Sequence, residues 1–276
     1  MRLGIHLPQY GRAASADAIT TVARRAEELG FQDVWVSDHV VVPAEQGYPS
    51  PYLYEPLLTM AWAAAATSRV RLGTSVLVVP HHHPLGMANS VASLDKLSGG
   101  RLTLGVGVGW SAAEFAALDQ DFATRGKRMD EALDIYRAAW ETDPVSHDGG
   151  FYDFEGMKLQ PKPEARIPIW VGGGADAAIR RAARHDGYQG ISTEPDEMAK
   201  LIQRLKDEGA RDDFVFSYRT GWDPNGMDPE QIREEAATYA ESGVHHVVSA
   251  PWRSTVEEWV DSMEQLTELV PFGPAE

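Results

Sequence analysis

The sequence predicts an α/β protein built as an eight-stranded parallel β/α (TIM) barrel. Three observations support this fold class. Short apolar runs alternate with longer amphipathic runs along the chain, which is typical of a parallel sheet. Eight strand–helix units fit within 276 residues, as such a barrel requires. The turn after the first strand, PQYGRAASA, lacks the G-x-G-x-x-G pattern of an open dinucleotide-binding sheet.

The strands are expected where short apolar segments are bounded by polar or turn-forming residues. The third is alternating and β-branched, and the sixth is the weakest of the eight. They cover residues 3–7, 34–37, 70–79, 102–108, 167–171, 188–192, 214–218 and 244–249.

The helices are expected where apolar residues recur every three or four positions between capping residues. Ser15 begins the first helix and Gly30 ends it, and Asp228 with Pro229 begins a later one. Further N-caps are expected at Thr193 and Ser254. The other helices are expected over residues 55–67, 85–97, 129–140 and 175–185.

One segment interrupts the alternation of strands and helices. Residues 142–163, TDPVSHDGGFYDFEGMKLQPKP, are rich in glycine, proline and aromatic residues and have no helical period. We therefore expect a hairpin or excursion inserted into a single barrel domain that spans residues 1–276, and no boundary between two domains.

Composition excludes several functional classes. The chain has no cysteine, which removes disulfides, thiolate nucleophiles and cysteine-ligated metal centres. Its formal charge of −16 disfavours nucleic acid and anionic membranes as partners. The N-terminal sequence lacks the apolar core of a signal peptide, and no run is long enough for a membrane span. We expect a cytoplasmic protein.

Active sites of β/α barrels form at the C-terminal ends of the strands. The fifth strand ends in Gly172, Gly173 and Gly174, and a helix begins at Ala175. Glycine lets backbone N–H groups approach a ligand closely, and a helix N-terminus favours an anion. The pattern indicates a phosphate-binding loop, and the alternative is a flexible turn that binds nothing.

The fourth strand has glycine at every second position: Gly105, Gly107 and Gly109. In a pleated strand these residues face one side of the sheet. That side either accommodates a flat ligand or allows tight packing.

Polar residues follow the second and third strands. Asp38 and His39 either contact a ligand ring or serve a structural role in a loop. His81, His82 and His83 are consecutive, and neighbours in an extended chain point apart. A partly solvated loop is therefore favoured over a metal site, and no residue is assigned as a metal ligand.

Several segments occur in the order and spacing of a known family. They are GIHLPQYG, DVWVSDHVVVP, RLGTSVLVVPHHHPLGMA, GGRLTLGVGVGW, ATRGKRMDEAL, IPIWVGGG and DGYQGI, and together they span nearly the whole chain. Through them the chain resembles the luciferase-like monooxygenase superfamily, and within it the coenzyme F-420-dependent oxidoreductases. The segments distinguish this deazaflavin branch from FMN-dependent members less sharply.

The resemblance implies a cofactor at the C-terminal mouth of the barrel, where Asp38 and His39 contact the deazaflavin ring. It also implies a bulge in the third strand with a non-prolyl cis peptide bond, which we place at Ser75–Val76, behind the ring. The other residues implied to hold the cofactor lie in this bulge, the fourth strand and the phosphate loop: Thr74, Gly107, Gly109, Gly172, Gly173, Gly174 and Ala175.

One position departs from the family pattern. In the sugar-phosphate dehydrogenase of this family, a glutamate at the end of the fourth strand is a proposed acid, and Trp110 stands there here. Neither that substrate nor that acid is carried over. Trp110 is expected to line the substrate pocket with Tyr10 and Trp252, and the alternative is plain packing at the rim.

The preferred hypothesis is hydride transfer between C5 of F-420 and a small organic substrate. His39 is the expected proton donor or acceptor, because imidazole titrates near neutral pH. One alternative is an FMN-dependent monooxygenase that receives reduced flavin from a separate reductase. The others are a metal-dependent hydrolase using His6, Asp38 and His39 with the histidine run, and a flavin-binding protein without activity. The resemblance also implies a homodimer that pairs through the second and third helices.

Overall fold

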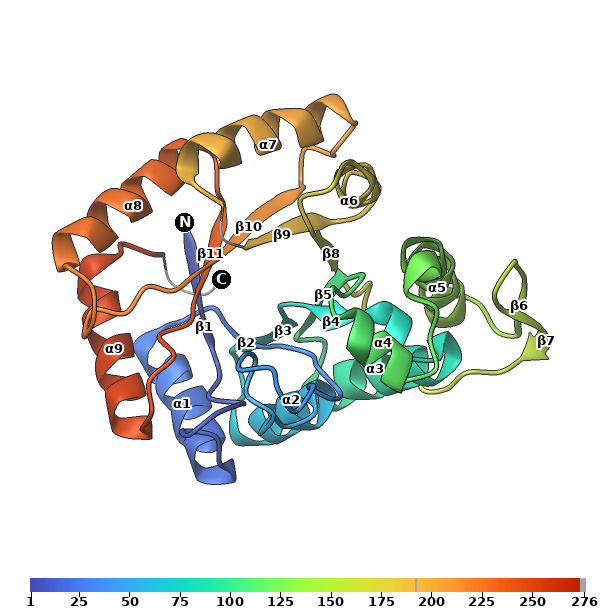
Figure 1. Ribbon diagram of the computed structural model, residues 1–276, viewed down its shortest axis with the longest axis horizontal. Helices are drawn as coiled ribbons and strands as arrows, with labels where there is room; N and C mark the ends of the chain where they lie inside the picture. The colour runs from blue at the N-terminus through green and yellow to red at the C-terminus, as the bar shows by residue number, and fades with distance from the viewer. Residues whose placement is uncertain (192, 274–276) are drawn as a thin grey trace.

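Parallel strands form a closed ring, because β3 (Arg71–Thr74) pairs with β2 (Asp33–Val36) on one side and with β5 (Leu102–Gly107) on the other. The structure is a computed structural model that describes residues 1–191 and 193–273. The ring continues through β1 (Arg2–His6), β11 (His246–Ser249), β10 (Val215–Thr220), β9 (Gly187–Ile191) and β8 (Ile169–Gly172). The predicted eight-stranded parallel barrel is confirmed (Figure 1).

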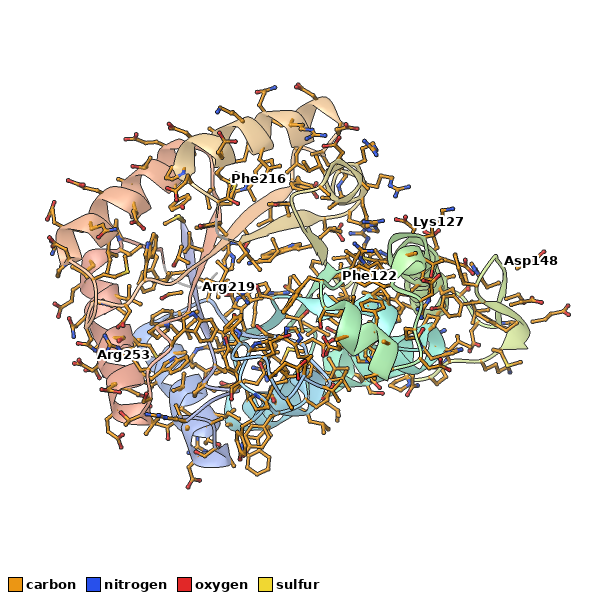
Figure 2. All side chains as sticks on the ribbon, viewed as in Figure 1. Phe122, Lys127, Asp148, Phe216, Arg219 and Arg253 are labelled. Carbon is orange, nitrogen blue, oxygen red and sulfur yellow. The ribbon has the colours of Figure 1, made fainter. Side chains whose placement is uncertain are left out.

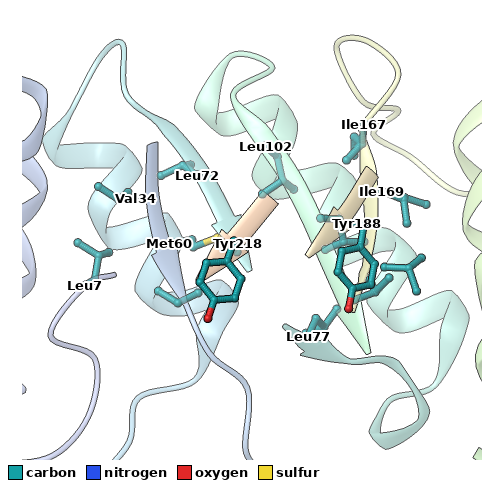
Figure 3. Close-up of a cluster of buried hydrophobic side chains, with 14 of the residues drawn as sticks. Leu7, Val34, Met60, Leu72, Leu77, Leu102, Ile167, Ile169, Tyr188 and Tyr218 are labelled. Carbon is teal, nitrogen blue, oxygen red and sulfur yellow. The ribbon is translucent and has the colours of Figure 1, made fainter. Parts of the chain in front are cut away.

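Helices surround the ring and cover its outer face (Figure 1). Leucine, isoleucine and valine side chains from the strands pack against them in one large buried cluster, part of which Figure 3 shows. The main helices are α1 (Ala16–Leu29), α2 (Pro56–Ala66), α3 (Pro84–Ser98), α5 (Arg125–Glu141), α6 (Asp176–Ala182), α7 (Pro195–Asp207), α8 (Pro229–Glu241) and α9 (Val256–Leu269). None of the helices over residues 1–191 and 193–273 combines the length and hydropathy that crossing a membrane requires.

Two stacked indole rings, those of Trp35 and Trp170, occupy the barrel interior. The rings of Trp35 and Trp170 lie 5.4 Å apart at an interplanar angle of 28°. Glycine on neighbouring strands makes room for them: a Cβ at Gly73 would lie 2.5 Å from Trp35, and one at Gly187 would lie 2.5 Å from Trp170. The bore is therefore a packed core, and a ligand can enter only at its end.

Three of the predicted helix caps agree with the structure. The Ser15 hydroxyl accepts a hydrogen bond from Ala18 N at 3.0 Å, and Gly30 adopts a left-handed conformation with φ of 87°. Asp228 caps α8 as predicted, by accepting from Glu230 N.

Two predicted caps are wrong by one residue. Glu194 precedes α7 in place of Thr193, because Pro195 occupies the first helical position. Thr255 caps α9 in place of Ser254, because its hydroxyl lies 3.2 Å from both Glu258 N and the Glu258 carboxylate. Ser192, the expected end of the sixth strand, lies outside the described residues.

The expected third strand is not continuous. It divides into β3 and β4 (Leu77–Val78), and Val79–His81 form a short 3-10 helix, η1. Between the two strands lies the predicted cis peptide bond at Ser75–Val76. The bulge implied by the family resemblance is therefore present, whereas a single strand over residues 70–79 is wrong.

The predicted excursion is a hairpin that projects from the barrel (Figure 1). It consists of antiparallel strands β6 (Val145–Asp148) and β7 (Asp153–Met157). Glu131 of α5 holds it by accepting hydrogen bonds from Phe151 N and Tyr152 N. Two short elements after β5 were not anticipated: α4 (Ala112–Ala117) and η2 (Phe122–Thr124).

Candidate active site

A cavity of about 530 Å³ lies where the C-terminal ends of the strands meet. Asp38 follows β2, Val76 lies between β3 and β4, and Gly173 follows β8, yet all three line this one cavity. The other predicted residues in its wall are Tyr10, His39, Ser75, Gly107, Gly109, Trp110 and Gly172. The barrel thus gathers residues from five strand ends.

One side of the cavity is shaped by backbone and one valine. A Cβ at Gly107 would lie 2.6 Å from Val76 Cγ2, and a Cβ at Gly172 would lie 3.1 Å from Val76 Cγ1. Only glycine fits beside Val76 without displacing it, which leaves a smooth surface for a flat ligand. Gly105 instead allows tight packing between strands, since a Cβ there would collide with the Thr74 carbonyl oxygen.

Asp38 offers a buried acceptor to the cavity. Because β2 ends at Val36, Asp38 and His39 lie beyond the strand and can both face the ligand space. Asp38 Oδ2 accepts from Val78 N at 2.9 Å and pairs with His82 Nε2 at 3.0 Å. Asp38 Oδ1 is buried and has no hydrogen-bond partner among residues 1–191 and 193–273. Such an oxygen fits an N–H donor of a heterocyclic ring.

His39 is oriented by a buried carboxylate. Its Nδ1 lies 2.9 Å from Oε2 of Glu114, a residue of α4 whose side chain is 1% exposed. Burial raises the pKa of Glu114, but hydrogen bonds from His39 and from Val40 N outweigh it and lower the pKa. An ionised Glu114 can only accept, so Nδ1 of His39 carries a proton and Nε2 is left for a ligand.

A polar chain crosses the mouth of the barrel. Burial and the nearby Arg219 lower the pKa of His6 to about 3, so this ring is neutral. His6 Nδ1 donates to Leu7 O at 2.8 Å, and its Nε2 therefore accepts from the Ser37 hydroxyl at 2.9 Å. Ser37 Oγ in turn accepts from Arg219 Nη1 at 3.0 Å. Arg219 also donates to Ser75 O at 2.6 Å, and it lines the cavity near the centre of the ring in Figure 2.

Comparison with known proteins identifies the family. Residues 1–221 match the family model described as luciferase-like monooxygenase. This chain belongs to that family.

Similar proteins are named for two cofactors. The chain is 32% identical over 272 residues to an F-420-dependent glucose-6-phosphate dehydrogenase of Gordonia bronchialis, covering 92% of this chain and 76% of the relative.

An F-420-dependent secondary alcohol dehydrogenase, solved with an F-420–acetone adduct, superposes with a TM-score of 0.82 at 19% identity. The oxygenating constituent of 3,6-diketocamphane monooxygenase from Pseudomonas putida, solved with FMN, superposes with a TM-score of 0.77 at 17% identity. Each of these two structures covers 98% of this chain, and this chain covers 98% and 97% of them respectively. These two similarities concern the fold.

Four residues predicted for the luciferase-like site lie outside the cavity wall. Trp252 does not line the cavity, and its ring packs against the Tyr10 ring with the two centroids 4.9 Å apart. Thr74 is buried and donates its hydroxyl proton to Gly105 O at 2.7 Å. Gly174 and Ala175 lie further along the loop that leads to α6.

The histidine run is partly solvated, as expected, but its first member is buried. The His81 side chain is 1% exposed and packs edge-on against Phe115 with ring centroids 4.6 Å apart. Burial lowers its pKa, although Glu114 and Asp38 oppose this. His82 pairs with Asp38, and only His83 is exposed. No group of three or more His, Asp or Glu side chains suited to a metal ion occurs over the described residues.

Sequence reasoning missed two functional candidates, Glu114 and Arg219. Glu114 had a signal, since Ser111 followed three residues later by Glu114 is a capping-box pattern, and Ser111 does cap α4. Arg219 had only its position at the end of the seventh strand. Tyr48, Pro49 and Leu53, from the loop after β2, also line the cavity.

Proposed function

We propose that this protein is an F-420-dependent oxidoreductase that transfers a hydride between the deazaflavin and a small organic substrate. The observation that carries the proposal is the convergence of the Asp38–His39 pair, the Val76 bulge and the glycines of two strand ends on one cavity. F-420 is favoured because relatives above 30% identity carry that cofactor in their names.

The residues present fit a flat anionic cofactor. Asp38 Oδ1 supplies an unpaired buried acceptor, and the surface formed by Val76, Gly107 and Gly172 would be filled by any larger side chain. When bound, the deazaflavin accepts or delivers a hydride at C5, and the protein aligns it. Other cavity residues proposed to hold it are His39, Ser75, Gly109 and Gly173, with Gly174 and Ala175 on the phosphate side of the loop.

His39 is proposed to exchange the proton that accompanies hydride transfer. Glu114 fixes the tautomer by accepting from Nδ1, so the proton moves at Nε2. Tyr10, Tyr48 and Trp110 form the outer wall and limit the access of water. Trp110 occupies the position of the acid proposed for the sugar-phosphate dehydrogenases, and an indole cannot serve as that acid. His39 is the only histidine in the described cavity wall, so the role is assigned to it.

An FMN-dependent monooxygenase, served by a separate reductase, is the second candidate. It is supported by the monooxygenase description of the family and by the FMN-bound neighbour, although the latter is only 17% identical. Both candidates use the same cavity and differ in the cofactor that occupies it.

Separate titrations of the purified protein with F-420 and with FMN, followed by fluorescence, test the order of the two candidates. We expect saturable F-420 binding with a Kd in the micromolar range or below, and FMN binding at least about tenfold weaker. Micromolar FMN binding without F-420 binding would reverse the order.

A further inference from the structure

The cavity contains one cationic side chain without an anionic partner. Arg219 of β10 is the only lysine or arginine in the cavity wall formed by the described residues. No carboxylate within residues 1–191 and 193–273 lies within 4.0 Å of it. Burial lowers the pKa of Arg219, and the groups that oppose this are the hydroxyls of Tyr10 and Tyr48, not a carboxylate.

Two other enclosed arginines of this chain have more of their nitrogens engaged. Arg181 is buried and binds Asp130 through Nε and Nη2. Arg101 has no carboxylate, but its Nε, Nη1 and Nη2 each donate to main-chain carbonyls. Arg219 differs from both, because only Nη1 donates, to Ser37 and Ser75, and neither Nε nor Nη2 donates to a described residue.

This arrangement holds the guanidinium in place while leaving two of its nitrogens for a ligand. The chain carries a formal charge of −16, so an unpaired cation in a concave site is a local exception to the field of the whole protein. A guanidinium presents paired N–H donors that match the two oxygens of a carboxylate. Around it, Tyr10 and Tyr48 offer hydroxyls, and Pro49 and Leu53 offer apolar surface.

We propose that Arg219 binds the carboxylate of the substrate, so that the substrate is a small organic acid with an apolar body. The substrate assignment rests on the proposed function, but the anion site can be measured without it. The cofactor ring is a second source of negatively charged oxygen in the same cavity, and the experiment separates the two.

The test uses isothermal titration of the purified protein with benzoate and with benzamide, which have the same shape and differ in charge. We expect benzoate to bind at least about tenfold more tightly than benzamide, the ratio a charged hydrogen-bonded pair supplies. Arg219→Gln should abolish this preference, and Arg219→Lys should keep part of it. Arg233→Gln, an exposed arginine on α8, is the charge-matched control and should keep all of it. Thermal melting establishes that each variant is folded.

Equal affinity for benzoate and benzamide in the unmodified protein, or a preference that persists in Arg219→Gln, would overturn the proposal. F-420 affinity of the same variants is measured in parallel. A loss of F-420 affinity of about tenfold or more in Arg219→Gln without any benzoate preference in the unmodified protein would assign the guanidinium to the cofactor and also overturn it. A benzoate preference in a protein that binds no F-420 would support the anion site while refuting the proposed function.

Discussion

Glu114 shows how one buried carboxylate can set the state of a neighbouring imidazole. It accepts from His39 Nδ1 and from Val40 N, and so ties a short helix to the loop after β2. Its role is positioning, because it does not line the cavity, whereas His39 does.

We expect Glu114→Gln to lower kcat by about 10- to 100-fold, because an amide no longer fixes the proton on Nδ1 of His39. F-420 affinity should change by less than about twofold, since Glu114 does not reach the cavity. Adding Glu114→Gln to His39→Gln should cost no further activity, because Glu114 acts through His39. Steady-state kinetics of both single variants and the double variant measure this.

Glu131→Gln, which loosens the hairpin and not the site, is the control. Additive losses in the double variant would contradict the positioning role.

Glu27 contributes to stability in a pH-dependent way. Its carboxylate accepts from the backbone N–H groups of Ser68, Arg69 and Val70. Burial raises its pKa, but these bonds outweigh burial and lower it to about 2. The folded pKa lies below the unfolded one, so the stabilisation is present above about pH 4.3 and is lost as the pH falls toward 2.

We expect Glu27→Gln to reduce the free energy of unfolding by about 1–2 kcal/mol at pH 7, a value discounted for partial exposure, and by less at pH 3. Urea unfolding at the two pH values measures the difference. Glu28→Gln removes the neighbouring exposed carboxylate and should have little effect at either pH. An equal effect of Glu27→Gln at both pH values would rule out the ionised carboxylate as the cause.

Among the elements, the bulge between β3 and β4 and the neighbouring strand β5 are complementary in shape. The Val76 side chain occupies the space that a side chain at Gly107 would need, and both face the cavity. The glycine spacing predicted that one side of this strand was open, but it left packing and ligand binding as equal explanations. The tertiary structure shows that both explanations apply, each to a different glycine. Gly105 allows close packing against Thr74, and Gly107 lines the cavity.

Gly107→Ala should weaken cofactor binding by about tenfold or more, because its Cβ would push Val76 out of its position. Fluorescence titration with F-420 measures the change. Gly86→Ala, in α3 with open space around the added Cβ, should leave the affinity unchanged. Unaltered affinity in Gly107→Ala would show that the surface beside Val76 does not contact the cofactor.

At the scale of the whole molecule, two outer helices keep large apolar side chains in water. Leu58 and Trp62 of α2 are 72% and 56% exposed, and Leu97 of α3 is 82% exposed. Large exposed apolar side chains on neighbouring helices are common at subunit contacts. We propose that α2 and α3 form the homodimer contact that the family resemblance implies.

Light scattering after gel filtration should give twice the mass of one chain. Leu58→Glu should shift the protein to a monomer, because it places a charge in the apolar contact. Met157→Glu, at an exposed apolar position on the distant hairpin, should leave the mass unchanged. A monomeric unmodified protein would contradict this use of the face.

Local sequence patterns predicted the alternation of strands and helices, the barrel, the hairpin and most of the glycine-rich strand ends. These features depend on local periodicity and turn chemistry, which any window of the chain displays. The resemblance to a family added the cis bond at Ser75–Val76, a feature that local periodicity does not reveal.

Only the tertiary structure decided which polar groups meet. Glu114 reaches His39 across 75 residues, and Arg219 reaches Ser37 across 182. Tyr10 and Trp252 both follow strand ends in the sequence, yet only Tyr10 lines the cavity, and Trp252 packs against it. Side-chain partners at such separations depend on which strand ends the closed ring places side by side and in what register, and no local pattern in the chain encodes that placement.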